Sequence, residues 1–301
     1  MTPSGPPDLS VSFAGIELKN PIIAASGTFG YGVEFEDIVH LDKLGGFVVK
    51  GLSKEPMTGN PPPRLFETPA GMLNAIGLQN IGVRAFLDEK LPALRQKKDI
   101  VVFANVFGYT RPDYEHALEI LNEGEGIAAY ELNVSCPNTA HGGIQFGSDP
   151  HLLDEVVRTA KRVARRPLIV KLSPNVTSIA QMAHVAQEAG ADAISLVNTF
   201  LAMAIDAETR RPRIANVTAG LSGPAIKPIA LRMVYQVHRA LPDIAAEHLI
   251  SVLRHPNQVI LAVPDRVAAA LVALHAPVYT GHVAHPCRLK AWGFLIPYRG
   301  L

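Results

Sequence analysis

The stretch PLIVKL at residues 167–172 decides the fold class, together with AISLVN at residues 193–198. Both runs are short, apolar and rich in branched side chains, as are strands buried on both faces of a parallel sheet. Between them, residues 177–189 carry apolar side chains at helical spacing, and Gly190 is placed to end that helix. The pattern predicts two parallel strands joined by a helix.

The same alternation extends outward over most of the chain. Segment 150–164 repeats apolar residues at i, i+3 and i+4, and Asp149 stands where an N-cap is expected. Repeated strand–helix alternation predicts a (β/α)₈ barrel or a doubly wound sheet. No Gly-x-Gly-x-x-Gly motif follows the first strand, which disfavours a dinucleotide-binding fold. Four more strand-like runs precede the strand–helix–strand segment at 167–198, and they lie at residues 21–26, 46–50, 100–106 and 129–135.

Polar side chains recur where the predicted strands end, and this favours the barrel. Ligands of (β/α)₈ barrels bind at the face formed by the carboxyl ends of the strands. One such residue alone would more often cap a strand end or face solvent, but six in succession indicate a shared site. The six are Ser26, Lys50, Asn105, Asn133, Lys171 and Asn198.

Composition excludes several classes of protein. The chain has 301 residues, a formal net charge of +1, 48% hydrophobic and 18% charged residues, which argues against a long disordered chain and against nucleic-acid or membrane-surface binding. Two cysteines, Cys136 and Cys287, exclude a disulfide framework and predict a reducing, cytoplasmic compartment. No apolar run is long enough to span a membrane, residues 1–7 lack the features of a signal peptide, and the histidines show no zinc-binding spacing.

Two lysines and a run of amides suggest the kind of ligand. Lys50 and Lys171 each end an apolar strand, so their ammonium groups either reach past it to solvent or face an anion or a ring that becomes negative. Gly51 allows close approach to the backbone. The amides in segment 74–80 would match a heterocycle with amide or imide groups, although an ordinary loop also uses Asn in turns.

Cys136 lies in the densest stretch, ELNVSCPN at residues 131–138, just past a predicted strand end. A lone cysteine is usually a small buried apolar side chain. Here the Gly-rich segment 139–147 follows and is long enough to close over a site, which favours a functional thiolate, either nucleophile or general base. Cys287 has no second cysteine at metal-binding spacing and is interpreted as structural or incidental.

Taken together, these motifs resemble the class 1 dihydroorotate dehydrogenases over residues 8–243. The resemblance includes Lys50-Gly51, segment 74–78, segment 133–138 and Gly220-Leu221-Ser222-Gly223. It implies a single FMN-binding TIM-barrel domain over residues 1–301, with FMN at the carboxyl ends of the strands. Cys136 and the absence of an N-terminal helical extension separate the chain from class 2 members, which use serine.

The subtype implied is type B. Type B catalytic subunits pair with an electron-transfer subunit that carries FAD and a [2Fe–2S] cluster and passes electrons to NAD⁺, as a heterotetramer of two catalytic and two electron-transfer chains. This chain has two cysteines, and such a cluster needs four, so the partner is required for NAD⁺ reduction. The implied reaction is the oxidation of (S)-dihydroorotate to orotate in pyrimidine biosynthesis.

The resemblance also assigns residue roles. Cys136 is implied as the general base that takes a proton from C5 of dihydroorotate while a hydride leaves C6 for the flavin. Lys171 is implied to stabilise charge on the reduced ring. The implied cofactor-binding set is Ser26, Lys50, Gly51, Asn105, Asn133, Lys171, Val197 and Gly223. The implied substrate-binding set is Lys50, Asn74, Ala75, Ile76, Gly77, Leu78, Asn133, Asn198 and Thr199.

After Asp243 the resemblance stops, and residues 244–301 are expected to diverge from the last two βα units. The family has a Gly-Gly and a Gly-Thr turn there that bind the FMN phosphate, whereas no glycine lies between Gly223 and Gly281. Segment 244–255 has a helical pattern. Segments 259–263 and 277–280 could replace strands around a helix at 266–275.

Two origins are open for this segment. It is either a replaced segment, such as a shifted reading frame would produce, or a divergent lineage with a rebuilt phosphate site. Two other functions also remain as alternatives to the dehydrogenase. One is a degenerate, non-catalytic chain with impaired FMN binding. The other is a flavin-free barrel lyase with Lys171 as the Schiff-base residue.

Overall fold

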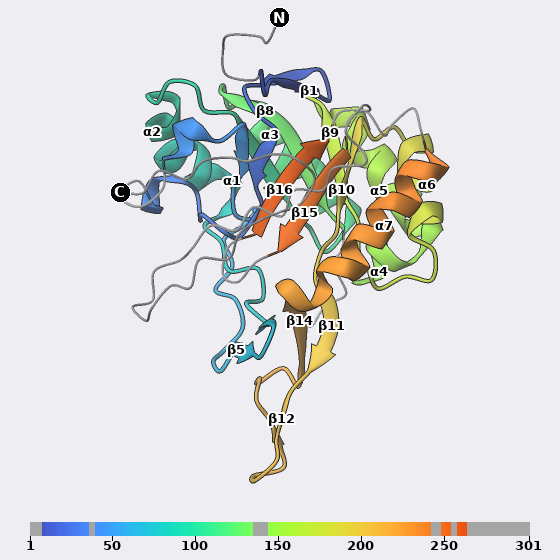
Figure 1. The fold of residues 1–301 in the computed structure, drawn as a ribbon. Coiled ribbons are helices and arrows are strands. Elements are labelled where there is room, and N and C mark those ends of the chain that lie inside the picture. The colour runs from blue at the N-terminus through green and yellow to red at the C-terminus, as the bar shows by residue number, and fades with distance from the viewer. Residues whose placement is uncertain (1–7, 36–39, 135–143, 242–247, 254–257, 264–301) are drawn as a thin grey trace, which may run out of the picture.

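The computed structural model describes residues 8–35, 40–134, 144–241, 248–253 and 258–263. Within these residues, strands close into a barrel in the order β10-β15-β16-β3-β4-β7-β8-β9. Figure 1 shows this barrel from the side. The predicted barrel is therefore confirmed, and the doubly wound sheet is excluded. The barrel strands are β3 (Ile22–Ala24), β4 (Gly46–Val48), β7 (Val102–Val106), β8 (Ile127–Asn133), β9 (Leu168–Lys171), β10 (Ala193–Leu196), β15 (His248–Leu253) and β16 (Gln258–Val263).

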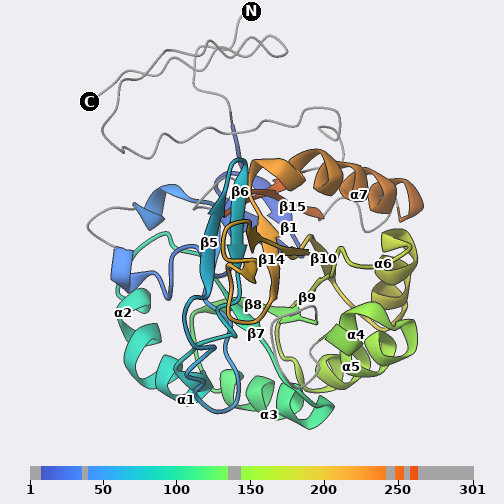
Figure 2. The ribbon, with the colours of Figure 1, turned by 90° about the horizontal axis from the view of Figure 1, so that it is seen from below.

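Helices surround the strands, as Figure 2 shows along the barrel. Five of the six strands predicted from sequence contain the strands β3, β4, β7, β9 and β10, and the sixth, at 129–135, overlaps β8, which begins two residues earlier. The predicted helices at 150–164 and 177–189 are confirmed. The helices are α1 (Gly82–Ala85), α2 (Leu91–Arg95), α3 (Arg111–Leu121), α4 (Ile144–Ser148), α5 (Pro150–Val163), α6 (Ile179–Glu188) and α7 (Lys227–Ala240), with a π-turn, η3 (Phe86–Lys90), between α1 and α2.

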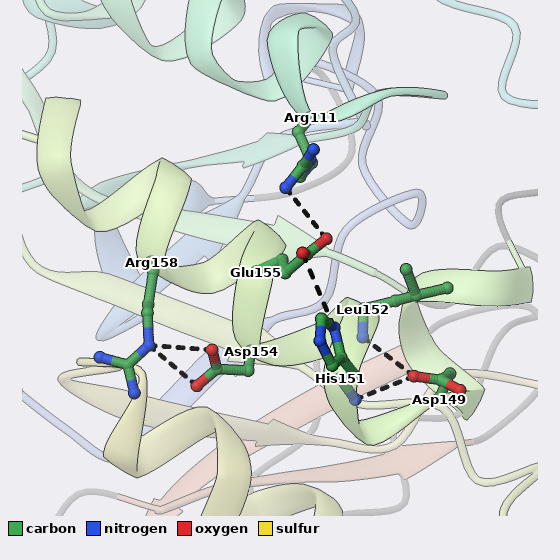
Figure 3. Close-up of polar contacts among 7 residues, drawn as sticks. All are labelled: Arg111, Asp149, His151, Leu152, Asp154, Glu155 and Arg158. Atoms are coloured by element: carbon green, nitrogen blue, oxygen red, sulfur yellow. Dashed lines mark hydrogen bonds and ion pairs between the residues drawn. The ribbon is translucent and has the colours of Figure 1, made fainter.

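Side chains at the start of α5 explain why it begins at Pro150. Asp149 accepts hydrogen bonds from the backbone N–H groups of His151 at 2.8 Å and Leu152 at 3.0 Å, so the predicted N-cap is confirmed (Figure 3). Arg111 of α3 forms an ion pair with Glu155 of α5 at 3.0 Å, which joins neighbouring helices on the surface. Gly190, with a φ of 103°, follows α6 in the left-handed conformation that ends helices.

The barrel interior has an apolar layer toward the amino ends of the strands and a polar layer toward their carboxyl ends. Val48, Phe103, Ala129 and Ile169 belong to one buried cluster, which the hairpin of β1 (Val11–Phe13) and β2 (Ile16–Leu18) extends at the amino ends of the strands. Alternate residues of a strand point to the same face, so the next inward positions fall two residues later. These positions are Lys50, Asn105, Glu131 and Lys171, and the polar layer therefore faces the carboxyl ends.

A second sheet lies beyond the carboxyl ends of the barrel strands (Figure 1). Its order is β11-β14-β6-β5, and the segments that follow β4 and β10 supply it. Its strands are all antiparallel, and Gly220 pairs with both Leu201 and Asn74. The strands are β5 (Leu65–Thr68), β6 (Gly71–Asn74), β11 (Phe200–Met203) and β14 (Thr218–Ser222), with a small hairpin, β12 (Ile205–Asp206) and β13 (Arg211–Pro212), farther out.

The last barrel strands differ from a regular (β/α)₈ fold. β15 runs parallel to β10, but β16 runs antiparallel to both β15 and β3, so the final unit is a hairpin. The expected helix over 244–255 is wrong in its described part, because residues 248–253 form β15. The open edge of β10 offers backbone hydrogen bonds, and such a partner overrides a weak local helical preference. β16 confirms the expected strand at 259–263, whereas segments 266–275 and 277–280 lie outside the described residues.

Among the described helices, none is long and apolar enough to cross a membrane.

Candidate active site

Three side chains from neighbouring strands meet in the polar layer. Asn105 of β7 stands opposite Glu131 of β8 in the parallel register. Its Nδ2 donates a hydrogen bond of 2.6 Å to Glu131 Oε1. Lys171 Nζ of β9 lies 3.6 Å from the same oxygen, and the two side chains of this ion pair are 6% and 0% exposed. A buried charge is stable only when it is paired, so the three residues act as one polar unit.

The orientation of the Asn105 amide follows from this contact. A carboxylate only accepts hydrogen bonds, so the NH₂ group of Asn105 must face Glu131 and its carbonyl oxygen must point away. Asn105 Oδ1 and Glu131 Oε2 are buried without a hydrogen-bond partner in the part of the chain that the structure describes. A Cβ added to Gly51 would lie 2.9 Å from Asn105 Oδ1, so this acceptor faces a backbone that carries no side chain.

Lys50 and Ser26 lie just past the ends of β4 and β3. The Ser26 hydroxyl donates a hydrogen bond of 2.8 Å to the backbone oxygen of Val49. Lys50 is half-buried, and burial lowers the pKa of its ammonium group, with a further lowering by the positive charge of Arg64 and an opposing effect of Glu34. A half-buried cation has lost part of its hydration. An anionic ligand would compensate this loss, so Lys50 is suited to bind one.

A second group of amides lies at the ends of β8 and β10. Asn198 Nδ2 donates to Asn133 Oδ1 at 3.2 Å, and the backbone N–H of Thr199 donates to Asn198 Oδ1 at 2.8 Å. Asn175 Nδ2 donates to the backbone oxygen of Thr199 at 3.0 Å and thereby anchors the segment that leaves β10. Tyr114 donates to the backbone oxygen of Asn133 at 2.9 Å.

The second sheet connects Asn74 to these amides. Asn74 Nδ2 donates to the backbone oxygen of Gly220 at 3.4 Å. A Cβ on Gly220 would lie 2.1 Å from Thr199 Oγ1, so strand β14 packs directly on Thr199. Contacts therefore run without a break from Asn74 through Gly220 and Thr199 to Asn198 and Asn133.

The other predicted residues have more varied positions. Ala75 is fully buried, Ile76 is partly buried, and Gly77 and Leu78 have φ values of 71° and 57°. Leu78 approaches the barrel, since a Cβ on Gly51 would lie 3.9 Å from its Cδ2 atom.

Val197 and Gly223 also lie in tightly packed surroundings. The Val197 side chain belongs to the main hydrophobic core, which leaves its backbone for any ligand contact. Gly223 has a φ of 104°, and a Cβ there would lie 2.7 Å from Gly71 Cα. Only glycine therefore fits at position 223.

Two sequence predictions have other outcomes. Cys136 lies outside the described residues, so its predicted place near the site stays a prediction. Glu131, in contrast, is a site residue to which the sequence interpretation gave no role. Its signal was available, because a charged side chain occupies an inward position of a strand whose outward neighbours Tyr130 and Leu132 are buried.

The comparison with protein families decides the classification. The family profile described as dihydroorotate dehydrogenase matches residues 8–246. The chain belongs to the dihydroorotate dehydrogenase family. The match ends close to the point at which the sequence departs from the family pattern, so family membership rests on the barrel up to α7.

Individual relatives of the family agree with this assignment. The chain is 67% identical over 235 residues to a protein of Solibacter usitatus named "Putative dihydroorotate dehydrogenase A (fumarate)". It is 55% identical, over 235 residues in each case, to dihydroorotate dehydrogenase B (NAD(+)) catalytic subunits of Pelobacter propionicus and Geotalea daltonii. Each of these matches covers 78% of this chain and 77% of the relative.

The residues at the site fit the ring of a flavin. The polar edge of an isoalloxazine has carbonyl acceptors and an imide N–H donor, and the site offers cations, amide N–H groups and the unpartnered acceptor Asn105 Oδ1. The fit to the phosphate is poor, because residues 224–280 contain no glycine to form the tight turns that bind phosphate through the backbone. No cluster of metal-ligating side chains occurs in the described ranges.

Proposed function

We propose that this chain oxidises dihydroorotate to orotate, with FMN as the hydride acceptor, in pyrimidine biosynthesis. The family assignment and the names of its relatives support this reaction. The observation that carries the proposal is the polar layer at the carboxyl ends of the strands. There, Asn105, Glu131 and Lys171 form one unit next to the linked amides Asn133 and Asn198.

The chain's own residues would bind and orient the substrate. Lys50 would attract the carboxylate of dihydroorotate, since its half-buried ammonium lacks full solvation. The linked amides Asn74, Asn133 and Asn198 would hold the two amide edges of the pyrimidine ring, because a carboxamide both donates and accepts. Thr199 and segment 75–78 would complete this side of the pocket.

The redox step needs a base and a cofactor. Cys136 would remove the proton from C5 while the hydride leaves C6, so the substrate loses two hydrogens and gains a double bond. A bound flavin supplies the hydride acceptor. Ser26, Gly51, Asn105, Val197 and Gly223 would hold FMN, together with Lys50, Asn133 and Lys171, and Lys171 would stabilise the negative charge of the reduced ring.

The electrons would then pass to NAD⁺ through a partner subunit. We propose the type B arrangement in the cytoplasm, with FAD and a [2Fe–2S] cluster on the partner and two copies of each chain. The chain's two cysteines are too few for such a cluster. The Solibacter relative, named for fumarate, points to a different acceptor. Assays of the purified chain with fumarate, and with NAD⁺ in the presence and absence of the partner, distinguish the two acceptors.

The test of the proposed reaction is direct. The purified chain, supplied with FMN, is expected to show the yellow absorption of bound flavin and to oxidise dihydroorotate with an artificial electron acceptor. A colourless protein that does not take up FMN would show that the proposed reaction is wrong.

A second candidate function is a degenerate, non-catalytic chain, and two observations favour it. Strand β16 runs antiparallel where a regular barrel has a parallel strand, and residues 224–280 contain no glycine. Any dihydroorotate oxidation above that of a Cys136→Ala variant would eliminate this candidate. The flavin-free lyase predicts a borohydride-trapped adduct on Lys171 with a carbonyl substrate, and the family match does not favour it.

A further inference from the structure

The barrel interior holds a buried carboxylate, Glu131, to which the proposed reaction assigns no role. Glu131 has no exposed surface, it lies two residues before Asn133 on β8, and its position is below the amides proposed to hold the substrate. A buried carboxylate is expensive in free energy unless it is paired, so a purely structural barrel would favour an apolar residue at this inward position.

The contacts of Glu131 point to a specific task. One oxygen, Oε1, accepts from Asn105 Nδ2 at 2.6 Å and lies 3.6 Å from Lys171 Nζ. The same atom thus determines which end of the Asn105 amide faces the site and where the Lys171 ammonium rests. Without the carboxylate, either end of the amide fits, because the carbonyl and NH₂ groups have nearly the same shape.

We propose that Glu131 is a positioning residue that sets the reduction potential of the bound flavin. It acts through two groups, by turning Asn105 Oδ1 toward the backbone of Gly51 and by compensating the positive charge of Lys171. This inference rests on the proposed function, since it concerns the ring that Asn105 and Lys171 would contact.

The sign of the effect follows from the charges. Reduction places negative charge on the ring, and a nearby cation stabilises this charge. A carboxylate 3.6 Å from the Lys171 ammonium offsets that stabilisation and holds the potential down. The low dielectric of the buried site strengthens both interactions.

The experiment compares flavin potentials of the FMN-loaded chain and its variants. Glu131→Gln keeps the shape and removes the charge, so the midpoint potential should shift to more positive values, and FMN should dissociate about tenfold more readily because Asn105 is no longer oriented. Glu131→Asp keeps the charge and should hold the potential close to wild type. Tyr130→Phe is the matched control on the same strand, since Tyr130 contacts Asn122 and Arg166 instead, and it should leave the potential unchanged.

The outcomes separate the two proposals. A wild-type chain that never takes up flavin overturns the proposed function. A flavin-loaded Glu131→Gln variant with the wild-type potential and only a lower melting temperature overturns the positioning role. If Glu131→Gln does not fold, the Glu131→Gln/Lys171→Met variant removes both buried charges and is compared with Lys171→Met. The potential should be higher in the double variant, and an equal or lower value overturns the inference.

Discussion

Asn198 Nδ2 donates a hydrogen bond of 3.2 Å to Asn133 Oδ1 and so joins the ends of β10 and β8 across 65 residues of sequence. The bond consumes one acceptor and one donor. Asn198 Oδ1 accepts from the backbone N–H of Thr199 at 2.8 Å, which fixes how the amide is turned. The two amides therefore form a pair whose orientation is set by contacts within the protein.

We expect Asn198→Ala to weaken orotate binding about tenfold or more, because Asn133 loses its orienting partner and the ligand loses a hydrogen bond. Asn198→Asp should be at least as damaging, since a carboxylate cannot donate to Asn133 Oδ1. Titration of orotate into the flavin-loaded chain, followed by the flavin spectrum, measures the change.

Asn122→Ala provides the control for this pair. Asn122 accepts from the Tyr130 hydroxyl at 2.9 Å and donates to the backbone oxygen of Val163, away from the polar layer. The variant should lower the melting temperature without changing the dissociation constant of orotate. Equal losses of affinity in the Asn122 and Asn198 variants would contradict the assigned role of Asn198.

Removal of the Lys50 charge should have opposite effects on the stability of the fold and on ligand binding. Burial and Arg64 lower the pKa of Lys50 below its usual 10.5. At neutral pH the burial of the Lys50 ammonium therefore destabilises the folded state by its full amount. This destabilisation decreases as the pH rises from the lowered pKa toward 10.5, the pKa of the unfolded state. We expect Lys50→Met to unfold at a higher temperature than wild type at pH 7 and to lose most of its affinity for orotate.

The pH dependence gives an independent check of Lys50. Because the ammonium is lost at a lower pH than in an exposed lysine, orotate affinity of the wild type should fall on the alkaline side before pH 10.5 is reached. The Lys50→Met variant should show no such fall. An alkaline loss of affinity that persists in Lys50→Met would assign it to another group.

The first six strands of the barrel and the helices at 150–164 and 177–189 were predictable because the decisive signals are local. The apolar, branched side chains of residues 168–171 and 193–196 indicate buried strands without reference to other segments. Helix ends are likewise indicated locally, by the capping side chain of Asp149 and by the left-handed backbone of Gly190. The alternation of side chains along each strand then brings Asn105 and Lys171 to the same face.

Contacts between distant segments were not predictable in this way. Asn74 meets Gly220 across 146 residues, and nothing in either segment alone indicates that they pair. The helical pattern of 244–255 failed for a related reason, since the strand edge that recruits β15 lies on β10. The inward position of Glu131 could be recognised from its own strand, but its contacts could not, because Asn105 and Lys171 lie on other strands.

Cys136→Ser tests the base. A serine hydroxyl is a far weaker base than a thiolate near neutral pH, so turnover should fall by at least about a hundredfold while FMN remains bound. Stopped-flow measurement of flavin reduction by dihydroorotate isolates this step from the later transfer of electrons. Cys287→Ser is the matched control and should reduce flavin at the wild-type rate. Wild-type reduction in Cys136→Ser would remove Cys136 from the mechanism.

Asp149→Ala tests the structural account of α5 apart from any function. Loss of the two hydrogen bonds to His151 and Leu152 should lower the free energy of unfolding by about 1 kcal/mol, measured by urea denaturation. Asp154→Ala removes only an exposed ion pair with Arg158 on the same helix and should lower the free energy of unfolding by less than Asp149→Ala does. Equal losses in the two variants would contradict the capping role of Asp149.

The missing glycines predict an unusual selectivity for flavins. Binding by the ring edge involves Asn105 and Lys171, whereas residues 224–280 provide no glycine turn for a phosphate. We expect FMN and riboflavin to bind the apoprotein with dissociation constants within about tenfold of each other, a difference of about 1.4 kcal/mol. Fluorescence quenching of each flavin by the apoprotein gives both constants. A preference for FMN of a hundredfold or more in this chain would show that its phosphate site has been rebuilt from other residues, and would favour a divergent lineage over a replaced C-terminal segment.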